Sequence, residues 1–182
     1  MTLAVSLLTA EEYAALPDDG QPTELIRGVV VPTPVPFPRH GEICAQAAYL
    51  LQMHLETHPI SRAVGRSAVI TERDPDTVRG PDLCFYSYAR TPRGRLPEGY
   101  LPVAPELVIE VRSPDDRWGE IYGKAVEFLG AGVTLVCVLD QQTETAYVFH
   151  TDQAPRPVAR DEELTLPEVL PDFRVAVRRF FE

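Results

Sequence analysis

A carboxylate within an apolar strand is the chain's clearest sign of chemistry. Residues 107–111 (LVIEV) are short and rich in β-branched side chains, which is typical of a buried strand. Burying the ionised carboxylate of Glu110 is costly unless a cation, a metal ion or a shifted pKa compensates. Upstream, Asp82 follows Pro81 and begins a second apolar segment, residues 83–86. Two carboxylates on two strands therefore indicate a site for a divalent metal ion.

Two basic residues follow Glu110 in positions from which they can reach the same site. Arg112 has the same strand parity as Glu110, so it should point to the same face. Lys124 lies on the next predicted helix at the edge of its apolar stripe, where a long side chain can extend toward the sheet. Metal-bound carboxylates with a nearby cation suit phosphodiester hydrolysis, because the ion activates water and the cation stabilises developing negative charge. Two roles remain open for Arg112, which either takes part in the chemistry or only neutralises Glu110; it cannot act as a base.

The remaining pattern predicts the elements that must position these groups. Expected helices cover residues 9–16, 40–57 and 115–129, and expected strands cover 24–31, 63–71, 83–86, 106–112, 133–139 and 145–150, with a last strand or turn at 174–181. A proline-rich loop at 32–38 and a charged turn at 72–80 separate some of them. One face of the 40–57 helix carries His40, Cys44, Ala47, Ala48, Leu51 and Leu55. This order predicts a mixed α/β sheet with helices packed on it.

Composition limits the class of protein. A chain of 182 residues with 45% hydrophobic content is expected to form one domain with a sizeable core. The three cysteines, Cys44, Cys84 and Cys137, contain no CxxC pair and lie in apolar segments, so we expect buried reduced thiols and a cytoplasmic location. Residues 1–8 lack the basic start of a signal peptide, and no segment approaches the ~18 apolar residues of a membrane span.

Charge argues against a broad nucleic-acid-binding surface. The chain has 17 basic and 27 acidic residues, which gives a net charge of −10. A local basic cleft is still compatible with this balance. Arg90, Arg93 and Arg95 lie in a loop rich in proline and glycine, which is either a solvated loop or a loop that contacts phosphates.

Several motifs together resemble a known group of nucleases. The segments Pro81-Asp82 and Glu110-Val111-Arg112 match the motif of the PD-(D/E)XK nuclease superfamily, with arginine in the usual place of lysine. More closely, the chain resembles the Uma-type family of putative restriction endonucleases over roughly residues 9–181. The matching segments are residues 24–28, 39–40, 80–83 and 105–114, followed by Lys124, residues 131–133 and Asp140.

The resemblance implies a restriction-endonuclease-like α/β fold, a mixed sheet flanked by helices, in a single nuclease-like domain over residues 1–182. It implies that Asp82, Glu110 and the carbonyl of Val111 bind Mg²⁺, with Mn²⁺ as a substitute. Lys124 would be the catalytic lysine, moved from the strand to the helix, and DNA would be the substrate. From the residues themselves, Glu24 is a candidate either to support these ligands or to bind the metal as a further ligand, and His40 is either a capping or core histidine or a supporting residue of the site.

Two other functions remain open from the sequence. A non-catalytic nuclease-like module would bind nucleic acid or a protein partner, which the overall acidity favours and the intact acids oppose. A plain α/β domain would use Glu110 and Arg112 as a structural ion pair. A homodimer is compatible with either.

Overall fold

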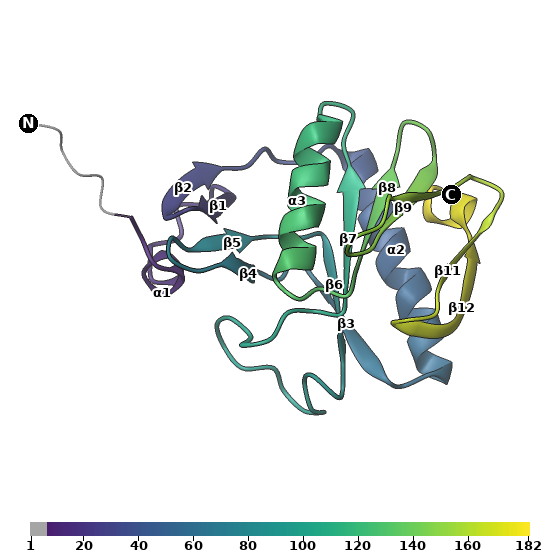
Figure 1. Ribbon diagram of the computed structural model, residues 1–182, viewed down its shortest axis with the longest axis horizontal. Coiled ribbons are helices and arrows are strands. Elements are labelled where there is room, and N and C mark those ends of the chain that lie inside the picture. The colour runs from purple at the N-terminus through teal and green to yellow at the C-terminus, as the bar shows by residue number, and fades with distance from the viewer. Residues whose placement is uncertain (1–6) are drawn as a thin grey trace, which may run out of the picture.

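A six-stranded sheet forms the centre of the computed structural model (Figure 1). The structure describes residues 7–182, so the expectation that residues 1–8 are not a signal peptide lies largely outside the described residues. The strand order is β10-β9-β8-β7-β6-β3. The strands are β3 (Ser61–Gly65), β6 (Leu83–Ser87), β7 (Leu107–Arg112), β8 (Leu135–Asp140), β9 (Thr145–Phe149) and β10 (Arg156–Val158). Only β7 and β8 pair in parallel, and every other neighbouring pair is antiparallel. The predicted mixed sheet is therefore confirmed.

Two helices cover opposite faces of this sheet. Helix α3 (Trp118–Gly130) connects the parallel strands β7 and β8, and its residues Ile121, Ala125 and Phe128 pack on Val108 and Val136. Helix α2 (Pro38–Thr57) lies on the other face, where its buried side chains join odd-numbered residues of β7 such as Ile109. Because alternate residues of β7 enter the two layers, Glu110 and Arg112 belong to the α3 face.

A second, antiparallel sheet has the order β2-β1-β5-β4. Its strands are β1 (Thr23–Ile26), β2 (Val29–Pro32), β4 (Val69–Glu72) and β5 (Thr77–Arg79). The expected single strand over 24–31 is wrong, because Arg27 and Gly28 both have positive φ and turn the chain into a hairpin. The expected strand over 63–71 is likewise divided between β3 and β4, and the charged turn at 72–80 contains β5.

The terminal segments complete the structure. Helix α1 (Ala10–Ala14), within the helix expected over residues 9–16, begins with a capping box between Thr9 and Glu12. At the other end, β11 (Glu163–Leu166) and β12 (Leu170–Ala176) form a hairpin, followed by the 3₁₀ helix η1 (Val177–Phe180). This C-terminal segment packs into the core layer beside α2.

Within residues 7–182, no helix is both long and apolar enough to cross a lipid bilayer.

Candidate active site

The two predicted carboxylates meet at one end of the larger sheet. Asp82 immediately precedes β6, and Glu110 lies near the carboxyl end of the antiparallel neighbour β7. The backbone N–H of Val111 donates a hydrogen bond of 2.8 Å to Oδ2 of Asp82. This bond fixes the Asp82 carboxylate beside the residue that follows Glu110. Both helices also begin at this end of the sheet (Figure 1).

The environment of Glu110 disfavours its charge. Burial, and then the nearby charge of Asp82, raise the pKa of the Glu110 carboxyl to about 8. Lys124 opposes this shift, but no ion pair or side-chain hydrogen bond joins Glu110 to any residue in the range 7–182. A half-buried carboxyl that bonds to no other described side chain, beside a second carboxyl, is a site that a divalent cation would stabilise.

Lys124 projects from α3 toward the acidic residues. Its Nζ lies 3.7 Å from Oε1 of Glu24. Burial lowers the pKa of Lys124, but the carboxylates of Glu110 and Glu24 outweigh burial, so the pKa is raised overall. Because its pKa is raised, Lys124 remains a cation at neutral pH. Lys124 is also the only lysine in the chain.

Glu24 connects the second sheet to this site. It lies on β1, and its carboxylate accepts hydrogen bonds from the Arg79 side chain at 2.9 Å and from the Gly80 N–H at 3.1 Å. Burial raises the pKa of Glu24, but Lys124, Gly80 and Arg79 together lower it. Arg79 also makes a bidentate pair with Glu127 of α3, at 2.6 and 2.9 Å. Arg79 thus holds β1, β5 and α3 together around Lys124, a role that the sequence did not reveal.

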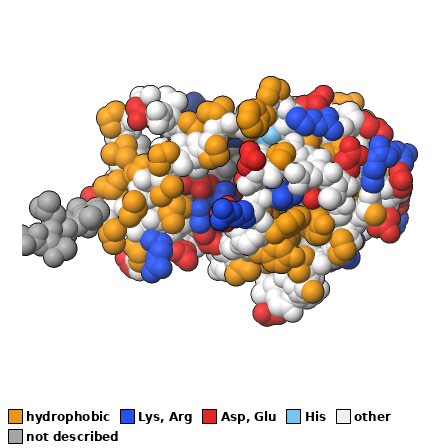
Figure 2. All heavy atoms as spheres, turned by 90° about the horizontal axis from the view of Figure 1, so that it is seen from above, with side chains coloured by type: hydrophobic (Ala, Val, Ile, Leu, Met, Phe, Trp, Pro, Cys, Tyr) orange, Lys and Arg blue, Asp and Glu red, His pale blue; other side chains and the backbone are white. Residues whose placement is uncertain are grey.

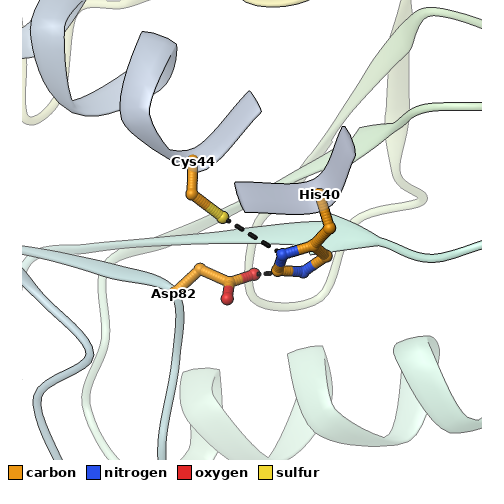
Figure 3. Close-up of side chains that lie close together, drawn as sticks. All are labelled: His40, Cys44 and Asp82. Atoms are coloured by element: carbon orange, nitrogen blue, oxygen red, sulfur yellow. Dashed lines mark hydrogen bonds and ion pairs between the residues drawn. The ribbon is translucent and has the colours of Figure 1, made fainter. Parts of the chain in front are cut away.

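His40 and Cys44 approach Asp82 from α2 (Figure 3). Nε2 of His40 lies 3.3 Å from Oδ2 of Asp82, and Sγ of Cys44 lies 3.4 Å from Nδ1 of His40. The hydrogen bond to Asp82 raises the pKa of His40, although burial opposes it. Burial, followed by the charge of Asp82, raises the pKa of the Cys44 thiol. Cys44 was expected only as a buried core thiol, yet it is half-buried and faces the site.

Arg112 does not pair with Glu110, so of its two open roles the neutralisation of Glu110 is wrong. Its guanidinium donates to Oδ1 of buried Asp140 at 2.9 Å and to the Asp116 carbonyl at 3.0 Å. It also lies over the Trp118 ring, 5.0 Å from the centroid. Strand parity placed Arg112 on the correct face, but its long side chain extends toward β8 and the start of α3 rather than back to Glu110.

The arginine loop lies at the opposite end of the sheet. Residues 88–106 connect the carboxyl end of β6 to the amino end of β7 and form the long loop at the bottom of Figure 1. Arg90 donates to the carbonyls of Ala104 and Gly132, and Arg93 donates to the Pro59 carbonyl. Arg95 is exposed and pairs with Glu98. Antiparallel pairing of β6 and β7 puts this loop far from Asp82, so these arginines do not join the site.

The donor set fits a hard divalent cation. Asp82 and Glu110 offer carboxylate oxygens, and the main chain of Val111 lies beside them, where its N–H bonds to Asp82. Oxygen atoms are the ligands that Mg²⁺ prefers. Glu110 supports this fit, because its half-buried carboxyl bonds to no other side chain among residues 7–182. Figure 2 looks down onto this end of the molecule, where acidic and basic side chains lie side by side near the middle of the face.

Comparison with protein families shows to which family the chain belongs. The Uma2 family, described as putative restriction endonuclease, matches residues 10–178. The chain belongs to the Uma2 family. Among solved structures, the Uma2 chain is similar to a crystal structure from Anabaena variabilis, described as a putative nuclease belonging to DUF820. The TM-score is 0.80 at 21% identity, covering 96% of this chain and 97% of the other, so the likeness shows the fold. The comparison with curated proteins gave no match.

Proposed function

We propose that this Uma2 protein is a Mg²⁺-dependent endonuclease that hydrolyses DNA phosphodiester bonds. The observation that carries the proposal is Glu110, a half-buried carboxyl that bonds to no side chain among residues 7–182 and lies beside Asp82 and opposite Lys124, where burial and Asp82 raise its pKa to about 8. A carboxyl whose pKa is raised by burial and by a neighbouring carboxylate is typical of metal and catalytic sites. The family and the restriction-endonuclease-like fold support a nuclease.

The residues would divide the work between binding and charge stabilisation. Asp82, Glu110 and the Val111 carbonyl would hold Mg²⁺, which supplies Lewis-acid polarisation of the phosphate and a water of lowered pKa. Lys124 is a cation at neutral pH, so it would stabilise negative charge on a phosphate oxygen or orient the water rather than accept a proton. Glu24 would orient Lys124 through the 3.7 Å contact.

Arg112 and His40 would act through these residues. Arg112 fixes the carboxyl end of β7 by its bond to Asp140, which keeps Glu110 in position two residues away. His40 holds the Asp82 carboxylate together with the Val111 N–H. Mn²⁺ is expected to replace Mg²⁺, because it accepts the same oxygen ligands.

Supercoiled plasmid cleavage with Mg²⁺ or Mn²⁺ tests the proposal. We expect the wild type to cleave and Glu110→Gln to lose activity by at least ~10²-fold, because the substitution removes a metal-binding charge while preserving shape. Glu120→Gln is the matched control, since Glu120 is an exposed carboxylate in the first turn of α3.

Two outcomes would contradict the proposal, the first its assignment of Glu110 and the second its endonuclease activity. Equal cleavage by Glu110→Gln and the wild type would remove Glu110 from the site. DNA binding without cleavage, with Mn²⁺ bound, would instead support the non-catalytic module that the sequence left open.

A further inference from the structure

Three side chains of different ligand type gather at the start of α2. His40, Cys44 and Asp82 each offer one ligand atom, and these atoms all lie within 4.8 Å of one another (Figure 3). His40 and Cys44 are four residues apart, so they project from the same face of α2. Asp82 reaches them from the segment before β6, where the Val111 N–H fixes its carboxylate.

The spacing of these atoms suits a tetrahedral metal ion. Zinc binds nitrogen, sulfur and carboxylate oxygen at about 2.0–2.3 Å, which places its ligand atoms roughly 3.3–3.8 Å apart in a tetrahedron. The 3.4 Å between Sγ of Cys44 and Nδ1 of His40 lies in this range, and the three candidate ligand atoms all lie within 4.8 Å of one another. Asp82 makes its 3.3 Å contact with Nε2, the other ring nitrogen, so only one of the two contacts can join ligand atoms of a single ion. Three protein ligands would leave a fourth position for water. Mg²⁺, by contrast, is a poor match for sulfur and imidazole ligands.

We propose that His40, Cys44 and Asp82 form a second cation site, selective for thiophilic divalent ions such as Zn²⁺, that shares Asp82 with the Mg²⁺ site. The thiol of Cys44 releases its proton to solvent as the sulfur binds the ion. An ion held there withdraws the Asp82 carboxylate from Mg²⁺ and inhibits cleavage. The inhibition rests on the proposed function, whereas the binding of the ion does not.

Among the described residues, the other cysteines and the other paired histidines do not combine a sulfur with a nitrogen ligand. Cys84 and Cys137 are buried within strands β6 and β8 and belong to no such cluster in residues 7–182. His54 and His58 stack with their ring centroids 4.3 Å apart and are also four residues apart, so they offer two nitrogens without sulfur. Only the site at Cys44 would give a bond between sulfur and the metal.

Cobalt titration tests the binding directly. Co²⁺ replaces Zn²⁺ and gives an absorption band for charge transfer from a bound thiolate, so the full chain is titrated with Co²⁺ under a reductant that does not chelate. We expect the band in the wild type, in Glu110→Gln and in the control His58→Gln, and its loss in Cys44→Ser and His40→Gln. Melting curves verify that each variant is folded, and Cys44→Ala replaces Cys44→Ser if the latter unfolds.

No band in the wild type, or an undiminished band in Cys44→Ser, would overturn the site. Glu110→Gln separates the two proposals, because it should lose cleavage while keeping the band.

Inhibition by Zn²⁺ is measured in a second experiment, in which Zn²⁺ is added to the Mg²⁺-dependent cleavage reaction. For each protein we compare the Zn²⁺ concentration that halves its own cleavage rate. Cys44→Ser should need at least ~10-fold more Zn²⁺ than the wild type, since losing even an outer partner of a metal ligand costs about 10–100-fold in affinity. An equal Zn²⁺ requirement would overturn the inhibitory role.

Discussion

Glu110 couples stability to pH in the metal-free protein. Its pKa of about 8 in the folded chain lies above the ordinary value of 4.5, so the folded state binds the proton more tightly than the unfolded state. A raised carboxyl pKa contributes stability while the group is protonated. That contribution is lost as pH rises from about 4.5 through 8.

We therefore expect Glu110→Gln, which cannot ionise, to gain stability relative to the wild type as pH rises from 5 to 8. The difference should be on the order of 2–4 kcal/mol at pH 8 and small at pH 5. Urea unfolding with a chelator present measures it. Saturating Mn²⁺ should abolish the difference or reverse it, because the ion stabilises the ionised Glu110. A pH-independent difference would contradict the raised pKa.

Besides the α-amino group, the only amine that acylating reagents can modify is that of Lys124, the single lysine in the chain. Acylation removes its charge, and we expect cleavage to fall about 10²–10³-fold, as when one group that stabilises the transition state is lost. Reductive methylation preserves the charge and should preserve more of the activity. The activity that Lys124→Arg retains should resist acylation, since a guanidinium does not react. Loss of that activity on acylation would place the sensitive amine elsewhere.

At the scale of elements, an ion pair joins the ends of the two parallel strands. Arg112 of β7 and Asp140 of β8 are register partners, and both are buried. The carboxylate of Asp140 also accepts from the Gln142 N–H and the Thr143 hydroxyl. The pair fixes the strand ends from which Glu110 and the start of α3 are positioned.

Arg112→Ala should destabilise the protein by about 3–5 kcal/mol, because it leaves the buried Asp140 charge without its cation. Thermal melts measure this loss, and replacing both partners with apolar residues, Arg112→Met with Asp140→Leu, should recover most of it. Mn²⁺ should not compensate selectively for Arg112→Ala, since the orphaned carboxylate is Asp140. Selective rescue by Mn²⁺ would show instead that Arg112 serves Glu110.

The elements that carry the site were largely predictable, because their patterns are local. Strands β6, β7 and β8 are continuous apolar segments, and α2 and α3 have clear apolar faces. The hairpin at Arg27-Gly28 was missed, because an arginine in the left-handed region is a weaker signal than Asn-Gly or Asp-Gly. β5 is only three residues long and lies within a charged segment, so only its pairing with β1 and β4 defines it.

Partners of long charged side chains could not be predicted from the sequence. Strand parity gives the face of Arg112 but not its choice of Asp140 over Glu110, which depends on where β8 ends. Arg79 is similar, because Glu24 and Glu127 are distant in sequence and meet only in the fold. The face shared by His40 and Cys44 was visible, but the arrival of Asp82 beside them was not.

Across the protein surface, positive charge is scarce, but part of it lies near the candidate site. The net charge is −10, yet both large helices direct their N-termini to the candidate site (Figure 1). Helix N-termini favour anions such as phosphates. Arg39 lies in the first turn of α2, and exposed Arg117 is the N-cap residue of α3. Together with Lys124, they offer a small set of cations for DNA.

A small set of cations predicts a shallow salt dependence of DNA binding. About three phosphate contacts give a slope of roughly −3 for the logarithm of the binding constant against the logarithm of salt concentration. Fluorescence anisotropy with Glu110→Gln, which should not cleave, measures the slope. Arg117→Ala should reduce its magnitude by about 1, whereas Arg95→Ala should leave it unchanged, because Arg95 lies in the loop at the opposite end of the sheet. A slope of −6 or steeper, or a loss of binding in Arg95→Ala, would mean that DNA contacts a broader surface that includes that loop.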